Sequence, residues 1–234
     1  MSTYAISDLH GYPLVELQKL LATAAFGAED TLYVLGDVID RNGDGGIAML
    51  RWMMERPNVL FIRGNHEQMM LECRYILDEI SDDFLIGFTE DMLQSLQRWT
   101  ANGGDVTMDN LARLSDEQKA AIFDYLEDTP LYEAVTVGDR DFVLTHAGLG
   151  NFRADKKLSE YTPMELLWER PMPDDRYFEN GVRTVFGHTP TIYYGREYRG
   201  CVMKTDTWMD IDTGAADGHQ PTLLRLDDLR TFPE

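Results

Sequence analysis

The sequence predicts an α/β protein of one domain, with helices on the outside of two packed β-sheets. In the first quarter of the chain, short apolar runs of strand length alternate with segments of helical periodicity, which is typical of a mainly parallel sheet with right-handed crossovers. In the second half, several β-like runs follow one another and favour a second, more antiparallel sheet. A length of 234 residues suits one domain with a sizeable core, so we expect a single domain over 1–234.

The β-α-β-α-β rhythm occupies the N-terminal part of the chain. Strands are expected at Tyr4–Ser7, Thr31–Leu35 and Asn58–Ile62, and helices at Leu14–Leu21 and Ile47–Met54. Pro13 stands where a first helical turn tolerates proline. The first sheet should therefore contain at least these three strands in parallel.

A mainly helical insert is expected at about 68–129. Helices are predicted at Gln68–Ile80, at Glu90–Thr100 and from a capping box at Ser115–Gln118 through Leu126, with a turn at Asn102–Asp105. After the insert, Leu131–Val137 and Phe142–Thr145 read as a hairpin, and Thr162–Glu165 opens a short helix. Further strands of the second sheet are expected at Thr184–Phe186, Val202–Met203, Trp208–Asp212 and Leu223–Leu226.

Charge and cysteine content narrow the class of protein. The net charge of −20 argues against a nucleic-acid groove and against binding to anionic membranes, although a metal cluster can still attract phosphate locally. Cys73 and Cys201 form no CxxC pair and are expected to be reduced thiols. Nothing resembles a signal peptide or a membrane span, so we expect a cytoplasmic protein.

Five short blocks share one arrangement, in which a β-like run ends in a tight turn that carries carboxylate, imidazole or amide side chains. The blocks are Asp8–Gly11, Gly36–Asn42, Gly64–Glu67, His146–Gly148 and Gly187–Pro190. Ends of neighbouring strands are where open α/β sheets build their sites. A single histidine or Gly-Asp pair in a turn is more often a surface or capping residue, but five such blocks in series favour a functional site.

The side chains in these blocks suit two divalent cations. Six residues form a plausible cage of mixed nitrogen and oxygen ligands: Asp8, His10, Asp37, Asn65, His146 and His188. The two-residue spacing of Asp8 and His10 places both on one side of an extended strand, and Asp37 could bridge two ions. Such ligands suit manganese, iron or zinc better than calcium, with manganese the first choice. Two ions about 3.5–4 Å apart polarise a phosphoryl group and make a hydroxide available at neutral pH.

Other polar residues of the blocks suit proton transfer and phosphate binding. His66 should turn away from its neighbour Asn65, which makes it a candidate general acid with Asp40 holding its other ring nitrogen. Arg41 and Arg170 can add contacts to phosphate oxygens. Arg63 is left open between a role in the site and an ion pair with an acidic neighbour, and His219 is expected to lie outside the site.

Together these blocks resemble the phosphoprotein phosphatase family of metallophosphoesterases, and within it the bacterial and bacteriophage serine/threonine phosphatases. The resemblance runs from Asp8 to Ala215. It implies a β-sandwich flanked by helices, one metal held by Asp8, His10 and Asp37, and a second held by Asp37, Asn65, His146 and His188. It also implies His66 with Asp40 as proton donor, and Arg41 and Arg170 on the phosphate. Ser7 and Asn42 replace the family's usual glycines, and neither position carries a ligand.

The leading functional prediction is a metal-dependent phosphatase of phosphoserine and phosphothreonine in proteins, acting by attack of a hydroxide held on the two metals. Symmetrical dinucleoside tetraphosphate hydrolysis is the alternative. Enzymes of that subgroup tend to carry aspartate after the GNH triplet, where this chain has Glu67. A non-catalytic module that binds phosphorylated partners is the third hypothesis, and the complete set of six ligands argues against it.

Overall fold

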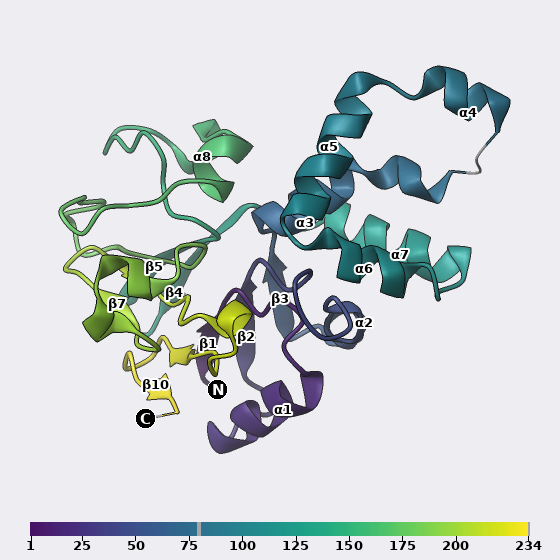
Figure 1. Ribbon diagram of the computed structural model, residues 1–234. Coiled ribbons are helices and arrows are strands. Elements are labelled where there is room, and N and C mark those ends of the chain that lie inside the picture. The colour runs from purple at the N-terminus through teal and green to yellow at the C-terminus, as the bar shows by residue number, and fades with distance from the viewer. Residues whose placement is uncertain (79–80, 234) are drawn as a thin grey trace.

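Two five-stranded sheets form the centre of the protein (Figure 1), seen in a computed structural model that describes residues 1–78 and 81–233. The first sheet has the order β10-β9-β1-β2-β3 and the second the order β4-β5-β6-β8-β7. The strands of the first sheet are β1 (Thr3–Ile6), β2 (Thr31–Leu35), β3 (Val59–Ile62), β9 (Leu223–Arg225) and β10 (Thr231–Phe232). Those of the second are β4 (Tyr132–Val137), β5 (Arg140–Thr145), β6 (Arg183–Phe186), β7 (Met203–Lys204) and β8 (Trp208–Asp210).

The two sheets pack face to face through a shared apolar core. Ala5, Leu35 and Ile62 of the first sheet meet Leu144, Val185 and Met209 of the second. Because side chains alternate across a strand, the neighbours Tyr4 and Ile6 face the opposite way and pack in a separate core with the helices. Central strands are therefore apolar on both faces, which explains their continuous apolar runs. The predicted two-sheet α/β sandwich is confirmed.

Helices cover the outer face of the first sheet, and the helical segment between β3 and β4 extends away from it (Figure 1). The α-helices are α1 (Leu14–Thr23), α2 (Ile47–Met54), α3 (Asn65–Glu72), α4 (Asp82–Gly87), α5 (Glu90–Ala101), α6 (Gly104–Leu111), α7 (Asp116–Glu127) and α8 (Pro163–Leu167). Short 3-10 helices lie at Arg74–Leu77, Leu158–Glu160, Thr191–Tyr194, Arg196–Tyr198 and Ala215–Asp217. The predicted capping box that opens α7 forms, and the short helix expected from Thr162 onwards is α8, which also begins with a capping box.

The composition of the second sheet differs from the prediction. Leu223–Leu226 was expected there, but β9 pairs antiparallel with β1 in the first sheet. The second sheet is also not the more antiparallel one, because each sheet contains two parallel and two antiparallel pairings. Short apolar runs show that a strand forms, whereas the choice of neighbour depends on contacts distant in sequence.

Two helix boundaries differ as well. The helix predicted at Gln68–Ile80 begins three residues earlier, inside the Gly64–Glu67 block, and α3 ends at Glu72, while Glu79 and Ile80 lie outside the described residues. The turn predicted at Asn102–Asp105 is shorter, because α6 already starts at Gly104. Glycine and asparagine in sequence favour a turn, but a glycine in the left-handed conformation can equally precede a helix start.

Membrane-spanning helices and disulfides are both absent from the part of the chain that is described. No helix there is long and apolar enough to cross a membrane. Cys73 is buried and Cys201 exposed, and both are free thiols.

Candidate metal centre

The residues expected to bind metal all follow the carboxyl ends of parallel strands in the two sheets. Asp8 and His10 follow β1, Asp37 follows β2, Asn65 opens α3 after β3, His146 follows β5 and His188 follows β6. Strands β1, β2 and β3 are parallel, as are β5, β6 and β8. Each sheet thus brings its loops to one edge, and packing of the sheets brings the two edges together.

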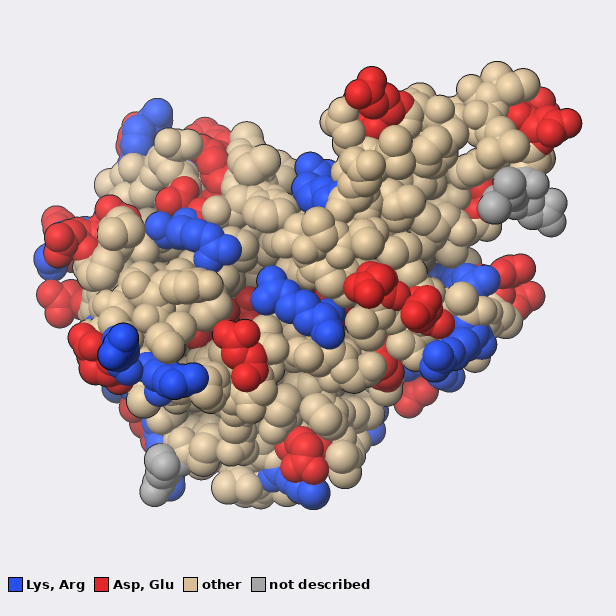
Figure 2. All heavy atoms as spheres, in the orientation of Figure 1, with Lys and Arg blue, Asp and Glu red and all other residues tan. Residues whose placement is uncertain are grey.

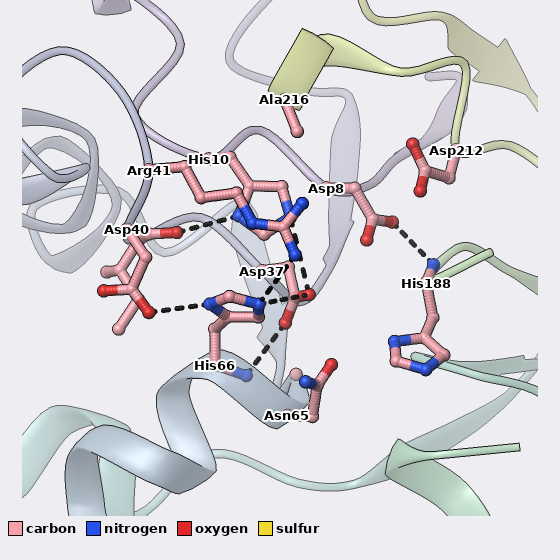
Figure 3. Close-up of polar contacts among 12 residues, drawn as sticks. Asp8, His10, Asp37, Asp40, Arg41, Asn65, His66, His188, Asp212 and Ala216 are labelled. Carbon is pink, nitrogen blue, oxygen red and sulfur yellow. Dashed lines mark hydrogen bonds and ion pairs between the residues drawn. The ribbon is translucent and has the colours of Figure 1, made fainter. Parts of the chain in front are cut away.

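Asp37 lies at the centre of these side chains (Figure 3). Its Oδ2 atom is 3.6 Å from Nε2 of His10 and 3.8 Å from Nε2 of His66, and its Oδ1 atom is 3.4 Å from Nε2 of His146. Among the described residues, two groups of side chains place their ligand atoms within 4.8 Å of one another: His10, Asp37 and His66, and Asp37, His146 and His188. Asp37 belongs to both groups, so it is placed to bridge two ions.

Asp8 belongs to neither group. Its Oδ2 atom accepts a hydrogen bond of 2.9 Å from the backbone N–H of His188. The prediction that Asp8 and His10 lie on one side of an extended strand is wrong. Both residues follow the end of β1 and have left-handed backbone conformations. The ligand role of Asp8 therefore stays a prediction.

Two histidine rings are oriented by backbone carbonyls. Nδ1 of His10 donates to the carbonyl oxygen of Ile39 at 3.0 Å, and Nδ1 of His146 donates to that of Leu35 at 2.8 Å. Each Nε2 then carries a lone pair, as metal-binding imidazoles require. Nε2 of His146 faces the Oδ1 atom of Asn65 at 2.8 Å, and two acceptors this close are stabilised by a cation that both can bind. Nε2 of His188 is buried and has no hydrogen-bond partner among the described residues.

Buried carboxylates make the same site favourable for cations. Burial, followed by the carboxylates of Asp212 and Asp37, raises the pKa of Asp8 well above its usual value, and burial raises that of Asp212 to about 7. Burial opposes the charge of Asp37 too, but the surrounding imidazoles, His146 first, hold its pKa below the usual value. Burial lowers the pKa of His10 to about 3 and keeps the ring neutral. Three buried carboxylates beside neutral imidazoles fit two divalent cations of the first transition row.

Backbone strain is concentrated at this centre. Nine described non-glycine residues have positive φ angles, and six of them are Asp8, His10, Asp37, Asp40, Arg41 and His188. The left-handed region is costly for residues with a Cβ atom and is often retained where function requires a particular side-chain direction. The strain therefore coincides with the residues that the sequence singled out.

His66 and Asp40 form the pair expected for proton transfer. Nδ1 of His66 lies 2.7 Å from Oδ2 of Asp40, which leaves Nε2 facing the cluster. Burial disfavours the charged ring, but Asp37 and Asp40 outweigh it and raise the pKa of His66. The side chains of Asn65 and His66 were expected to point in different directions as residues at the end of a strand. They are instead the first two residues of α3, where successive side chains point about 100° apart.

The two arginines border a pocket of about 110 Å³ over the cluster. Nη2 of Arg41 lies 3.2 Å from Nε2 of His66. Arg170 donates through Nη1 to the carbonyl oxygen of His188 and to Oγ1 of Thr189, which ties its guanidinium to the edge of the pocket. Both arginines are therefore placed to reach an anion bound over the cluster.

Several residues that support the site were not assigned from the sequence. Glu67 is fully buried, and its carboxylate accepts hydrogen bonds from the backbone N–H groups of Gly64, Asp37, Val38 and Ile39. Asp212 lies after β8 and lines the pocket, in a strand-end setting like that of the five blocks, so the same signal could have found it. Trp99 and Thr107 hold Asp40 from within helices, where no sequence signal indicates such a role.

Arg63, whose role the sequence left open, and His219, which was expected outside the site, both lie away from the cluster. Arg63 donates to Gln68, Thr129 and the carbonyl oxygen of Glu127, so it ties the end of β3 to the segment after α7. His219 contacts Arg199 at 3.4 Å and lines neither metal group, as expected.

Comparison with known proteins matches the chain to one family, and its relatives include a protein phosphatase and a dinucleoside tetraphosphatase. Residues 1–201 match the calcineurin-like phosphoesterase family. The chain is 27% identical to serine/threonine-protein phosphatase 1 of Salmonella typhimurium, over 95% of this chain and 91% of that protein. It is 26% identical to a symmetrical bis(5'-nucleosyl)-tetraphosphatase of Acidovorax, over 82% of this chain but only 59% of that protein. The crystal structure of a candidate diadenosine tetraphosphatase has the same fold, with a TM-score of 0.62 at 14% identity and coverage of 98% of this chain and 91% of that one.

Proposed function

Because the chain belongs to the calcineurin-like phosphoesterase family, we propose that it is a metal-dependent serine/threonine protein phosphatase. The observation that carries the proposal is the His66–Asp40 pair, which presents Nε2 to a pocket shared with the Asp37 cluster and Arg41. A phosphate bound over the cluster would have its ester oxygen within reach of that ring. The arrangement suits hydrolysis of a phosphomonoester whose alkoxide needs a proton to leave.

Each side chain has a definite part in this proposal. Asp8, His10, Asp37, Asn65, His146 and His188 would hold two divalent cations, for which manganese is our first choice. Such cations supply Lewis acidity toward the phosphoryl oxygens and a nucleophile at neutral pH. Arg41 and Arg170 bind the phosphate oxygens, His66 donates its proton to the leaving alkoxide, and Asp40 keeps the ring in the required tautomer.

A neighbouring groove supports a peptide substrate. A hollow of about 490 Å³ shares Arg170 and Tyr193 with the pocket over the cluster and is otherwise lined by Pro171, Met172, Pro173, Thr189 and Tyr194. No acidic side chain lines it, and Met172 and Tyr193 expose 65% and 75% of their surface. An apolar side chain next to the phosphorylated residue would fit there. The near-complete mutual coverage with a bacterial serine/threonine phosphatase agrees with this substrate class.

The charge distribution argues against long polyanions as partners. On the face shown in Figure 2, basic side chains lie in separate groups among acidic ones, with no continuous basic stripe. With a net charge of −20, phosphate attraction must come from the centre itself. We expect a phosphoprotein or phosphopeptide as partner, and neither nucleic acid nor a membrane.

Symmetrical dinucleoside tetraphosphate hydrolysis is the second candidate. It is favoured by the Acidovorax relative and by exposed Tyr193, on which a base could stack beside the pocket.

Turnover with manganese should therefore be compared between peptides carrying phosphoserine, phosphothreonine or phosphotyrosine and diadenosine tetraphosphate. We expect kcat/KM to be higher for the phosphoserine and phosphothreonine peptides. A preference for the dinucleotide would reverse the assignment. Tyr193→Ala should lower kcat/KM for either preferred substrate more than for glycerol phosphate, which has neither an aromatic ring nor an apolar side chain to contact Tyr193.

A further inference from the structure

The carboxylate of Asp40 is held mainly by the helical segment that follows β3. Nε1 of Trp99, in α5, lies 3.1 and 3.0 Å from its two oxygens. Oγ1 of Thr107, in α6, donates to Oδ1 at 2.6 Å. Nδ1 of His66 lies 2.7 Å from Oδ2 of Asp40. Asp40, Trp99 and Thr107 are all fully buried, so water does not compete for these bonds.

The same helices also hold the backbone beneath the carboxylate. The N–H of Asp40 donates to Oγ1 of Thr107 at 3.0 Å, and the N–H of Arg41 donates to the carbonyl oxygen of Gly103 at 3.0 Å. Both residues are in the left-handed conformation, with φ angles of 74° and 68°. Strained backbone of this kind persists only where its surroundings fix it. The α5–α6 turn supplies that support.

Close packing leaves the turn little freedom. Gly103, with a φ of 94°, separates α5 from α6. A Cβ atom on Gly104 would lie 2.5 Å from the Trp99 ring, so the indole is pressed against the start of α6. The metal ligands, by contrast, come from loops after strands and from the first residue of α3, and none comes from α5 or α6. The helical segment therefore fixes the positions of Arg41 and, through Asp40, of His66, and it does not position the proposed metal ligands.

We propose that Trp99 and Thr107 are positioning residues for the proton transfer: they fix the Asp40 carboxylate so that it accepts the Nδ1–H of His66 and directs Nε2 into the pocket. This inference rests on the acid role of His66 in the proposed function. In that reaction the oxygen of water joins phosphorus and the ester P–O bond breaks. The departing alkoxide takes the Nε2 proton, and the ring regains a proton from solvent. Without the two donors, the carboxylate can rotate and the ring loses its fixed direction.

Leaving groups of different basicity separate this role from a general loss of structure. Thr107→Val keeps the shape of the side chain and removes the hydroxyl, and Trp99→Phe removes the indole N–H. We expect kcat on a phosphoserine peptide to fall at least about tenfold in each variant, since a general acid supplies about 10²–10⁴-fold. On p-nitrophenyl phosphate, whose phenolate leaves without a proton, the fall should be less than about threefold. Thr107→Ser, which restores a hydroxyl, should recover most of the loss.

A matched control comes from the same helix. Leu111→Ala removes a buried apolar side chain of α6 that can donate no hydrogen bond to Asp40, so it loosens packing and leaves the donors to the carboxylate in place. This variant should lower kcat on the phosphoserine peptide and on p-nitrophenyl phosphate by the same factor. Equal losses on both substrates in Thr107→Val and Trp99→Phe, or no loss on the phosphoserine peptide, would overturn the inference.

A spectroscopic readout is independent of turnover. The chain has four tryptophans, so the indole N–H signal of Trp99 can be identified in an NMR spectrum by its disappearance in Trp99→Phe. We expect it to exchange slowly with solvent and to shift in Asp40→Asn; a signal that exchanges fast and is unmoved contradicts the inference. If wild-type protein hydrolyses diadenosine tetraphosphate but no phosphopeptide, the proposed substrate is wrong. The variants are then compared on glycerol phosphate and p-nitrophenyl phosphate, which tests the positioning role separately.

Discussion

Replacement of Gly36 by alanine should be far more damaging than replacement of Gly138, although both glycines have positive φ angles of 83° and 63°. A Cβ atom at Gly36 would lie 2.5 Å from Cα of Gly64 and 2.6 Å from Nδ1 of His146, whereas at Gly138 it would meet nothing within 4 Å. Left-handed strain costs both variants about 1–2 kcal/mol. Overpacking adds about 1–3 kcal/mol for Gly36→Ala alone.

Urea unfolding of the two variants tests this arithmetic. We expect the free energy of unfolding to fall by about 2–5 kcal/mol in Gly36→Ala and by about 1–2 kcal/mol in Gly138→Ala. Both variants should still fold, because the free energy of unfolding of such domains is about 5–15 kcal/mol. Since the displaced atom in Gly36→Ala is the nitrogen that anchors the His146 ring to Leu35, its affinity for manganese should also fall by about 10–100-fold. Equal stability losses in the two variants, or unchanged metal affinity in Gly36→Ala, would refute the reasoning.

Three further predictions concern catalysis, metal dependence and pH. His66→Asn should lower kcat on phosphoserine peptides by about 10²–10⁴-fold while metal analysis still finds two ions per chain, and full activity would exclude the acid role. Treatment with a chelator should abolish hydrolysis of p-nitrophenyl phosphate and added manganese should restore it; activity that survives complete removal of metal contradicts the proposal. The hydrogen bond from Lys156, followed by that from the Thr162 backbone, lowers the pKa of Glu165 to about 2. The ionised Glu165 carboxylate therefore stabilises the fold above its unfolded pKa of about 4.3, and this stabilisation is lost as the pH falls toward 2. At pH 7 the Tm of Glu165→Gln should be lower than that of the wild type, and the difference should shrink between about pH 4.3 and about pH 2. A difference that stays constant over this range would contradict the assignment.

The family could be predicted from the sequence, as could the gathering of most candidate site residues at strand ends, because each block is local. A strand followed by a turn with fixed side chains is specified within a few residues, and the resemblance based on these blocks is confirmed by the family match over residues 1–201. The first three strands were placed to within one residue at each end. Of the residues predicted as ligands, His10, His146 and His188 lie around Asp37, and Asn65 contacts His146.

Failures of prediction occurred where distant parts of the chain meet. The pairing of β9 with β1 brings together segments more than 200 residues apart, which no local pattern specifies. The start of α3 at Asn65 depends on Glu67, whose carboxylate accepts hydrogen bonds from backbone N–H groups of the loop after β2, about 30 residues earlier in the chain. The motifs do not choose the substrate either, because the chain is about equally similar to a serine/threonine-protein phosphatase and to a symmetrical bis(5'-nucleosyl)-tetraphosphatase.

The sequence by itself determined which residues gather at the strand ends and which chemistry they suit, because residue type and strand periodicity are local properties. Only the tertiary structure showed what holds them. Asp37 is the member common to both groups of side chains that could hold a metal ion. Asp40 owes its direction to Trp99 and Thr107, which lie 59 and 67 residues further along the chain. Hydrogen bonds over such distances exist only after the helices have packed against the sheet, so no reading of the sequence alone contains them.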